Sequence, residues 1–333
     1  MRFCYRDLVM HYRALVTTLQ GSCNQNNSKE LRLYRLRKRF ENSSSSRYFN
    51  NRNIMRRYKS ILLLCCILFL TLQTVSAKTI RVLAIGNSFS EDAIEQNLYE
   101  IVDAAGDKII IGNLYIPGCS LKRHYENSQT NANDYRYRKI GIDGKMREDG
   151  KCALKKALQD EKWDYISFQQ ASHFSGLYDT YEPYLSRLVE YVRDVVGKHP
   201  KFIWHQTWAY AQDSNHDGFK NYGHSQRQMY SAIIACSRKA VNDNRLFRVV
   251  PSGTAVQNVR TSFIGDTMNR DGYHLDLIHG RYTAACVWFE ILFRKSVIGN
   301  AYTPEGMSLA YREVIQRAAH AAVKKPYEIT PMR

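Results

Sequence analysis

Proline is scarce in this sequence, with 7 among 333 residues, and no Pro-rich hinge, repeat or low-complexity linker interrupts residues 78–333. Because nothing there marks a boundary between folding units, we expect a single domain of about 250 residues. Acidic residues are also few, since 31 Asp and Glu stand against 48 Lys and Arg. A hydrophobic content of 44% excludes a mostly disordered chain.

The excess of positive charge is concentrated before residue 78. Residues 1–77 contain 14 Lys and Arg and 3 Asp and Glu, whereas residues 78–333 contain 34 and 28. The expected domain is therefore only mildly basic, and its charge gives little reason to expect a nucleic-acid partner.

Long apolar runs are missing as well. The apolar run at residues 61–72 is shorter than the roughly 20 residues that a membrane-spanning helix needs. It follows a basic stretch at 56–59 and precedes Val75-Ser76-Ala77, an order typical of a secretory signal peptide. We therefore expect residues 55–77 to be a signal peptide cleaved after Ala77, and the protein to be secreted or periplasmic without stable membrane insertion. A retained membrane anchor is the less favoured alternative.

Residues 1–54 precede this signal, although a signal peptide works at the extreme N-terminus. They include a basic run at 31–40 and a polar run at 41–53. The simplest interpretation is a misassigned start codon, with translation beginning at Met55 and the first 54 residues carrying no fold. A basic nucleic-acid-binding arm is the competing interpretation, and it fits poorly beside an export signal.

Cysteine is sparse in the exported part, where only Cys119, Cys152, Cys236 and Cys286 remain. Their spacing matches neither a zinc site nor a redox pair. Disulfides are possible outside the cytoplasm, but the sequence assigns no pairing, and buried free thiols are at least as good an interpretation.

What the exported part does contain is an alternation of short apolar runs with longer stretches of helical spacing. This pattern is typical of a parallel sheet with helices on both faces. The predicted strands are Ile80–Ile85, Ile109–Ile116, Tyr165–Phe168, Phe202–His205 and Phe247–Val250. The predicted helices cover about 94–106, 185–197, 280–295 and 307–324. We expect the polar stretches 126–150 and 213–223 to be loops over the carboxyl edge of the sheet, where ligands bind in such folds.

One serine follows the first predicted strand directly, in Gly86-Asn87-Ser88-Phe89-Ser90. A helix is expected to begin just after it, so Ser88 would lie where free backbone N–H groups favour a developing negative charge. That position suits a nucleophile whose own N–H contributes to an oxyanion hole. The motif also occurs in ordinary turns, so alone it is a weak indication.

A matching base lies on the loop before the helix predicted at Gly280. There Asp271 precedes His274 by three residues, a spacing at which an aspartate can fix the imidazole tautomer while the other ring nitrogen faces a serine. A second pair, Asp276 and His279, follows at once. We expect His274 to be the base and His279 to be a cap or supporting residue, because His279 would abut the helix start.

These segments resemble the SGNH (GDSL-type) hydrolases. The similarity lies in the Gly-Asn-Ser turn, the Pro117-Gly118-Cys119-Ser120 turn and the Asp-Gly-Tyr-His loop, and it covers nearly all of residues 79–296. A bacterial SGNH-like family of unknown function, with a Gly-Asn-Ser-Phe start and a Trp-Ala-Tyr segment, is a narrower match. The resemblance implies a three-layer flavodoxin-like fold with a five-stranded parallel sheet, a triad of Ser88, His274 and Asp271, ester hydrolysis, and neither metal nor cofactor. It also implies that the N–H groups of Ser88 and Gly118 hold the oxyanion.

The third block of that family departs from the pattern. Gly-x-Asn-Asp is usual there, and this chain has Phe168-Gln169-Gln170-Ala171-Ser172. Either Gln169 or Gln170 could supply the third oxyanion donor, since Gln carries the amide of Asn on a longer stem. The alternative is that both amides only bond loop backbone.

Aromatic residues follow the fourth predicted strand, and we expect Trp208 and Tyr210, with Asn87, to contact substrate. Sugar rings stack on aromatic planes, and their hydroxyls need donors and acceptors. His216 and Asp217 nearby have no spacing that supports a closed metal site. The sequence thus predicts an exported serine esterase that removes acyl groups, such as acetyl, from carbohydrate. The alternatives are a lipase or lysophospholipase, which the polar loops disfavour, and a non-catalytic glycan-binding protein, which the altered third block favours.

Overall fold

The computed structural model describes residues 32, 34–36, 38, 39 and 77–333. The expected extension at 1–54 and signal peptide at 55–77 thus lie almost entirely outside the described residues, and both remain predictions. Within the described residues, no helix has the length and apolar character that a membrane span requires.

A mixed sheet of seven strands forms the centre of residues 79–333, in the order β4-β3-β2-β1-β5-β6-β7. The strands are β1 (Thr79–Gly86), β2 (Lys108–Tyr115), β3 (Tyr135–Ile140), β4 (Met146–Cys152), β5 (Tyr165–Phe168), β6 (Lys201–His205) and β7 (Arg248–Val250). β2, β1, β5, β6 and β7 are parallel to one another, whereas β3 pairs antiparallel with β2, and β4 pairs antiparallel with β3. The five predicted parallel strands are confirmed, but the prediction of a purely parallel five-stranded sheet is wrong.

The two additional strands come from residues 126–150, which the sequence predicted to be a loop. In β3, Tyr135 and Tyr137 are buried in the core, while Arg136 is exposed and pairs with Glu148 of β4 at 2.7 Å. Because the outer strands carry so many charged residues, their short apolar alternation was hidden. The hairpin covers the edge of β2.

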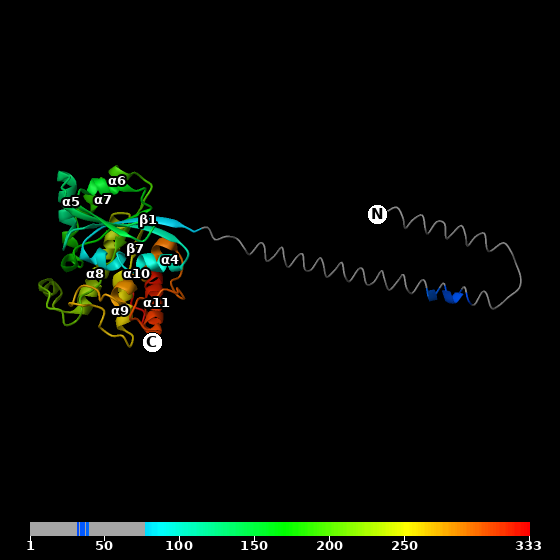
Figure 1. The fold of residues 1–333 in the computed structure, drawn as a ribbon. Helices are drawn as coiled ribbons and strands as arrows, with labels where there is room; N and C mark the ends of the chain where they lie inside the picture. Colours follow the sequence, from blue (N-terminus) through cyan, green and yellow to red (C-terminus); the bar gives the residue numbers. More distant parts are fainter. Residues whose placement is uncertain (1–31, 33, 37, 40–76) are drawn as a thin grey trace. The chain divides into compact units, whose positions relative to one another are not determined.

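Helices cover both faces of the sheet, which gives three layers (Figure 1). One face carries α5 (Leu121–Thr130), α6 (Leu154–Asp160) and α7 (Tyr184–Val196). The other carries α3 (Ser88–Ile94), α4 (Leu98–Ala104), α9 (Ser252–Arg260), α10 (His279–Phe293) and α11 (Leu309–Lys324). α8 (Gln226–Asp243) lies beside β6 and β7 and contributes side chains to both cores. The helix predicted at 94–106 is interrupted, because Asn97 has a left-handed φ of 65°.

β1 shows how the layers are held together. Val82 and Ala84 belong to one core, and Leu83 and Ile85 belong to the other, because successive strand side chains point to opposite faces. A strand buried on both faces reads as a continuous apolar run, which is why it was predicted correctly. The segments that follow β1, β5 and β6 meet at the carboxyl edge of the sheet.

The four cysteines of this part, Cys119, Cys152, Cys236 and Cys286, are free and buried. Burial raises the pKa of Cys119 to about 12 and that of Cys236 to about 11, so both are protonated thiols at neutral pH. The sequence left disulfides and buried free thiols open as interpretations, and in the structure the four cysteines are free thiols.

Candidate active site

Ser88 is the first residue of α3 and follows β1 after a single residue, Asn87. Asn87 is the N-cap, and its side-chain oxygen accepts the Phe89 N–H at 2.9 Å. Gly86 is the last residue of β1, and a Cβ at this position would lie only 2.2 Å from Ser90 Oγ. Only glycine therefore allows the strand to turn into the helix this tightly. The turn therefore holds Ser88 at the carboxyl edge of the central strand.

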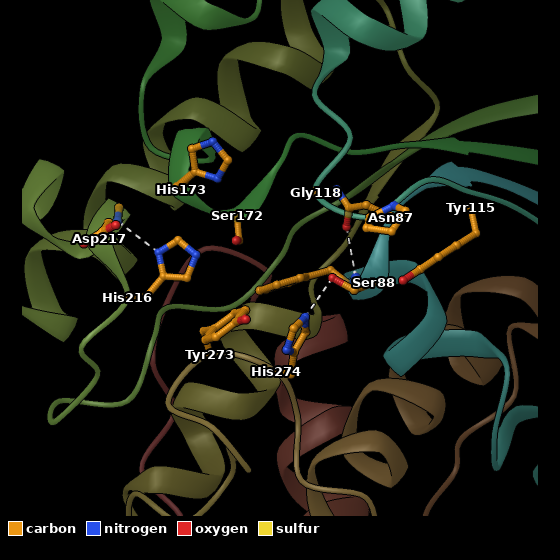
Figure 2. Close-up of a pocket in the computed structure, with 13 residues that line it drawn as sticks. Asn87, Ser88, Tyr115, Gly118, Ser172, His173, His216, Asp217, Tyr273 and His274 are labelled. Atoms are coloured by element: carbon orange, nitrogen blue, oxygen red, sulfur yellow. Dashed lines mark hydrogen bonds between the residues drawn. The ribbon is translucent and has the colours of Figure 1, made fainter. Parts of the chain in front are cut away.

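The structure brings Ser88, His274 and Asp271 together in one line of hydrogen bonds. Figure 2 shows the contact between Ser88 and His274. His274 Nε2 lies 2.8 Å from Ser88 Oγ, and His274 Nδ1 lies 2.7 Å from Asp271 Oδ2. Since a carboxylate only accepts, Nδ1 carries the proton, and Nε2 is left to accept the Ser88 hydroxyl. This is the arrangement that lets a serine lose its proton as it attacks a carbonyl carbon.

Asp271 is held in its ionised form. Burial alone would raise the pKa of this carboxyl, but the His274 ring and the backbone N–H groups of His274 and Tyr273 donate to it and bring its pKa below the usual range. Asp271 is thus an anion at neutral pH and orients His274 through its ring and its backbone.

The loop that carries Asp271 and His274 is closed at its base by a bridge between Asn269 and Leu275. Gly272 has a φ of +86°, and a Cβ there would lie 3.1 Å from the backbone of Ser214. A side chain at position 272 would therefore both strain the turn and push away the neighbouring loop. The loop geometry depends on this glycine.

Ser88 and His274 open into a cavity of about 450 Å³ (Figure 2). Its walls combine aromatic rings, histidines and small residues: Asn87, Ser88, Phe89, Tyr115, Pro117, Gly118, Ser172, His173, His216, Asp217, Gly218, Tyr273 and His274. Gly118, the predicted oxyanion donor, has a φ of +59° and lines this cavity. The predicted loop 213–223 does reach the site, whereas residues 126–150 contribute nothing to it.

Two histidines in the wall, His173 and His216, were not predicted as site residues. Burial lowers the pKa of His173, with a further contribution from His216, and burial also lowers the pKa of His216. The Gly218 N–H donates to His216 Nδ1 at 2.9 Å, which leaves its Nε2 to carry the proton. The sequence could have indicated these two residues, because both lie in polar segments that follow the parallel strands β5 and β6.

Gln169 and Gln170, predicted to hold the oxyanion, are both buried and do not line the cavity. The Gln170 amide group donates to the carbonyl of Thr180 at 3.0 Å and its oxygen accepts the Leu121 N–H at 3.0 Å. Gln169 Nε2 donates to Asn87 Oδ1 at 2.7 Å. Gln170 therefore bonds loop backbone, as in the alternative interpretation. Gln169 contacts the cavity-lining residues only through Asn87.

Trp208 and Tyr210, predicted to contact substrate, are fully buried beneath the cavity instead. Trp208 stacks on Phe89 with ring centroids 4.3 Å apart and donates its Nε1–H to the Tyr273 carbonyl at 2.7 Å. The Tyr210 hydroxyl lies 2.8 Å from Ser172 Oγ. Both residues support cavity-lining residues, and the aromatic side chains that line the cavity are Phe89, Tyr115 and Tyr273.

The second Asp-x-x-His pair serves the start of α10. Asp276 Oδ1 accepts the backbone N–H groups of Ile278 and His279, at 3.0 and 2.5 Å, and the His279 ring lies 4.8 Å from that of Tyr311. Asp276 is therefore the capping residue, and it is His274 that the structure brings to Ser88.

The fold and the site together define a doubly wound α/β protein with a hydrogen-bonded Ser–His–Asp arrangement at the carboxyl edge of its sheet. Among the described residues, no three His, Cys, Asp or Glu side chains are grouped so that they could hold a metal ion. The chain belongs to the DUF4886 family, described as a domain of unknown function, whose model matches residues 81–322.

The chain is also similar to solved structures. A DUF4886 family protein from Bacteroides uniformis is 54% identical, with a TM-score of 0.76 over 76% of this chain and 98% of that one. A proposed SGNH hydrolase from Slackia heliotrinireducens is 19% identical, with a TM-score of 0.44 over 64% of this chain and 98% of that one. An acetylxylan esterase from Geobacillus stearothermophilus, in a catalytic mutant form, is 12% identical, with a TM-score of 0.42 over 69% and 98%. The comparison with curated proteins gave no match.

Proposed function

We propose that this protein is a serine esterase that hydrolyses carboxylic esters, with O-acyl groups on carbohydrate as its substrates. The observation that carries the proposal is the pair of contacts from His274, 2.8 Å to Ser88 Oγ and 2.7 Å to Asp271 Oδ2, at the mouth of a cavity of about 450 Å³. A histidine that served only the structure would not need an aligned carboxylate on one nitrogen and a serine facing a cavity on the other.

In the proposed reaction, Ser88 Oγ attacks the ester carbonyl carbon while His274 Nε2 accepts the hydroxyl proton. The resulting imidazolium is stabilised by the anionic Asp271. His274 then gives the proton to the departing alkoxide, which leaves an acyl group on Ser88. A water molecule, deprotonated in turn by His274, releases the acid and restores the serine.

The oxyanion needs donors that face the cavity, and Asn87 meets this condition better than either glutamine. Asn87 Oδ1 accepts two hydrogen bonds, from the Phe89 N–H and Gln169 Nε2, which fixes the orientation of the amide. Its Nδ2 donates one proton to the Cys119 carbonyl at 3.0 Å. The second Nδ2 proton is left for the cavity, beside the N–H groups of Ser88 and Gly118. We assign Asn87 as the side-chain donor and Gln169 as the residue that positions it.

The cavity wall supports an uncharged, hydroxyl-rich substrate. Its lining residues, all in the described part of the chain, include no Lys or Arg. A neutral imidazole at His173 offers one donor and one acceptor, and His216, whose Nδ1 accepts the Gly218 N–H, offers its Nε2–H. These groups suit sugar hydroxyls, and Tyr115 and Tyr273 offer faces for a sugar ring. A phospholipid substrate would bring a phosphate that has no cation to meet it here. Secretion or periplasmic location after cleavage at Ala77 belongs to the same proposal.

A fluorophosphonate probe tests the proposal, because it forms a stable adduct only with an activated serine. The purified protein should gain one probe mass on Ser88, located by peptide mapping, and should hydrolyse p-nitrophenyl acetate. Ser88→Ala should lose both. Ser172→Ala, a second serine in the same cavity, is the control and should still be labelled. If the wild-type protein resists the probe and cleaves no activated ester, the non-catalytic glycan-binding interpretation is the better account.

A further inference from the structure

A group of six cations lies at the amino edge of the sheet, opposite the carboxyl edge that carries Ser88. Lys201 and Arg248 are the first residues of β6 and β7. These strands run in the same direction as β1, to which they are linked in the sheet by the parallel strand β5. The others lie in the segments before these strands and just after α10: Arg193, Lys198, Arg245 and Arg294. We call these six residues the amino-edge cations.

None of the amino-edge cations lies within 4.0 Å of a carboxylate oxygen in the described part of the chain, and five of them are exposed. Two neighbouring cations are paired: Arg81 lies 3.3 Å from Glu161, and Lys295, which follows the unpaired Arg294, lies 2.5 Å from Asp107. Asp164, beside β6, already accepts the Arg81 backbone N–H at 2.8 Å. Within the described residues, no ion pair closer than 4.0 Å neutralises any of the six amino-edge cations.

The surface is also hollowed. A depression of about 300 Å³ is lined by Arg193, Lys198 and Arg245 together with Phe202 and Phe247. Phe247 is 39% exposed, and its ring lies 4.6 Å from the side-chain charges of both Lys201 and Arg248. Phe247 thus connects the depression to the remaining cations, so that charge and aromatic surface form one continuous site.

We propose that the amino-edge cations and the depression beside them bind an anionic polysaccharide. Carboxylate or sulfate groups along the polymer meet the cations, and a sugar ring lies against the exposed Phe247. Six cations spread across the surface match a repeated charge better than a single small anion. A flat layer of phospholipid head groups would leave the depression unfilled, whereas one sugar ring fits within about 300 Å³. The site is separate from the Ser88 cavity and does not depend on the proposed esterase function.

Binding of the purified protein to polygalacturonate, dextran sulfate and uncharged dextran tests this assignment. The test variant carries Arg193→Gln, Lys198→Gln and Arg245→Gln. The matched control carries Lys108→Gln, Arg147→Gln and Lys156→Gln, which remove three exposed cations that are paired with Asp103, Asp143 and Asp149. Both variants lower the net charge equally, so only the location of the lost charge differs.

We expect the wild-type protein to bind one or both charged polymers, in a salt-dependent manner, and not uncharged dextran. The test variant should bind about tenfold more weakly, and the control variant should bind like the wild type. Hydrolysis of p-nitrophenyl acetate, if present, should be equal in all three. Equal weakening in both variants, or no binding to either charged polymer, overturns the proposal. Binding to phosphatidylglycerol vesicles or duplex DNA that matches or exceeds binding to the polymers also overturns it, because the surface would then not select polysaccharide.

Discussion

The carboxylate of Asp92 accepts the backbone N–H of Leu275 at 2.8 Å and so connects the helix that begins with Ser88 to the loop that ends with His274. Asp92 is fully buried, and it also accepts hydrogen bonds from Arg281 Nε at 2.8 Å and Arg270 Nη1 at 3.0 Å. The distance between nucleophile and base therefore depends on one carboxylate that touches neither.

Replacement of Asp92 tests this connection. Asp92→Ala leaves Arg281, which is buried, without its anionic partner, and removal of one member of a buried ion pair costs about 3–5 kcal/mol. We expect the free energy of unfolding, measured with urea, to fall by roughly this amount and kcat on an activated ester to fall with it. Asp103→Ala, which breaks the exposed pair with Lys108, is the control and should cost less than about 1 kcal/mol. Unchanged urea stability of Asp92→Ala would falsify the assignment.

The triad prediction concerns residues that act as a unit. Ser88→Ala, His274→Ala and the double variant should have similar residual esterase rates, because removing either nucleophile or base costs about as much as removing both. Asp271→Asn should fold normally and lower kcat by up to about 10⁴, since it favours the wrong imidazole tautomer. His279→Ala should lower kcat only slightly. Loss of turnover in His279→Ala with normal turnover in His274→Ala would transfer the triad to Asp276 and His279.

Asn87→Asp tests the side-chain oxyanion donor. Aspartate keeps the cap on Phe89 and the acceptor for Gln169 but has no N–H, so kcat should fall by about 10²–10³. Because the buried Cys119 carbonyl also loses its donor, the free energy of unfolding should fall by about 1–3 kcal/mol. Gln169→Ala should also lower kcat, since Asn87 then loses the donor that orients it. Gln170→Ala should instead lower stability by about 1–3 kcal/mol and leave kcat near normal. A normal kcat for Asn87→Asp shows that backbone groups alone hold the oxyanion.

Acid should weaken the fold through two buried histidines. Burial lowers the pKa of His205 and of His124 to about 3. In the unfolded chain each imidazole takes up a proton below its usual pKa of about 6.5, so between these values the unfolded state binds more protons and stability falls as pH falls. Each histidine contributes a slope of about 1.4 kcal/mol per pH unit. Urea unfolding between pH 7 and 4 measures this dependence of stability on pH. His205→Asn, which keeps a donor for Gln169, should lower the slope by about 1.4 kcal/mol per pH unit. An identical slope in that variant contradicts the buried, neutral His205.

Processing of the N-terminus is the remaining prediction. Export should remove everything before Lys78, because Val75-Ser76-Ala77 follows the apolar run. N-terminal sequencing of the protein isolated from its native host measures this. A mature protein that begins before Met55 would exclude a misassigned start codon.

The elements that the sequence predicted correctly are those whose pattern has a single physical cause. β1 is an unbroken apolar run because both its faces are buried, and the loop at 271–274 combines an acid and a base at a fixed spacing. β3 and β4 were missed because half of an edge hairpin faces water and carries charge. Fold class could thus be predicted more completely than the sheet itself.

The errors in the site have one origin: the sequence does not tell which side of a loop a side chain occupies. Trp208 and Tyr210 follow β6 at the correct edge, yet both turn into the core because Phe89 and Ser172 provide partners there. Gln170 does not face the cavity, because its amide oxygen accepts the backbone N–H of Leu121 and its amide nitrogen donates to the backbone carbonyl of Thr180. Such competition depends on contacts between segments that are distant in the chain.

Ser88 and His274 are 186 positions apart, so the two halves of the site lie near opposite ends of the domain. A chain that emerges with its N-terminus first exposes the serine long before its base exists, and in that interval Ser88 is an ordinary alcohol. Under the proposed function, reactivity therefore begins only when the chain has been made past His274 and folded, so the esters of the producing cell do not meet an activated Ser88 in a partly made protein.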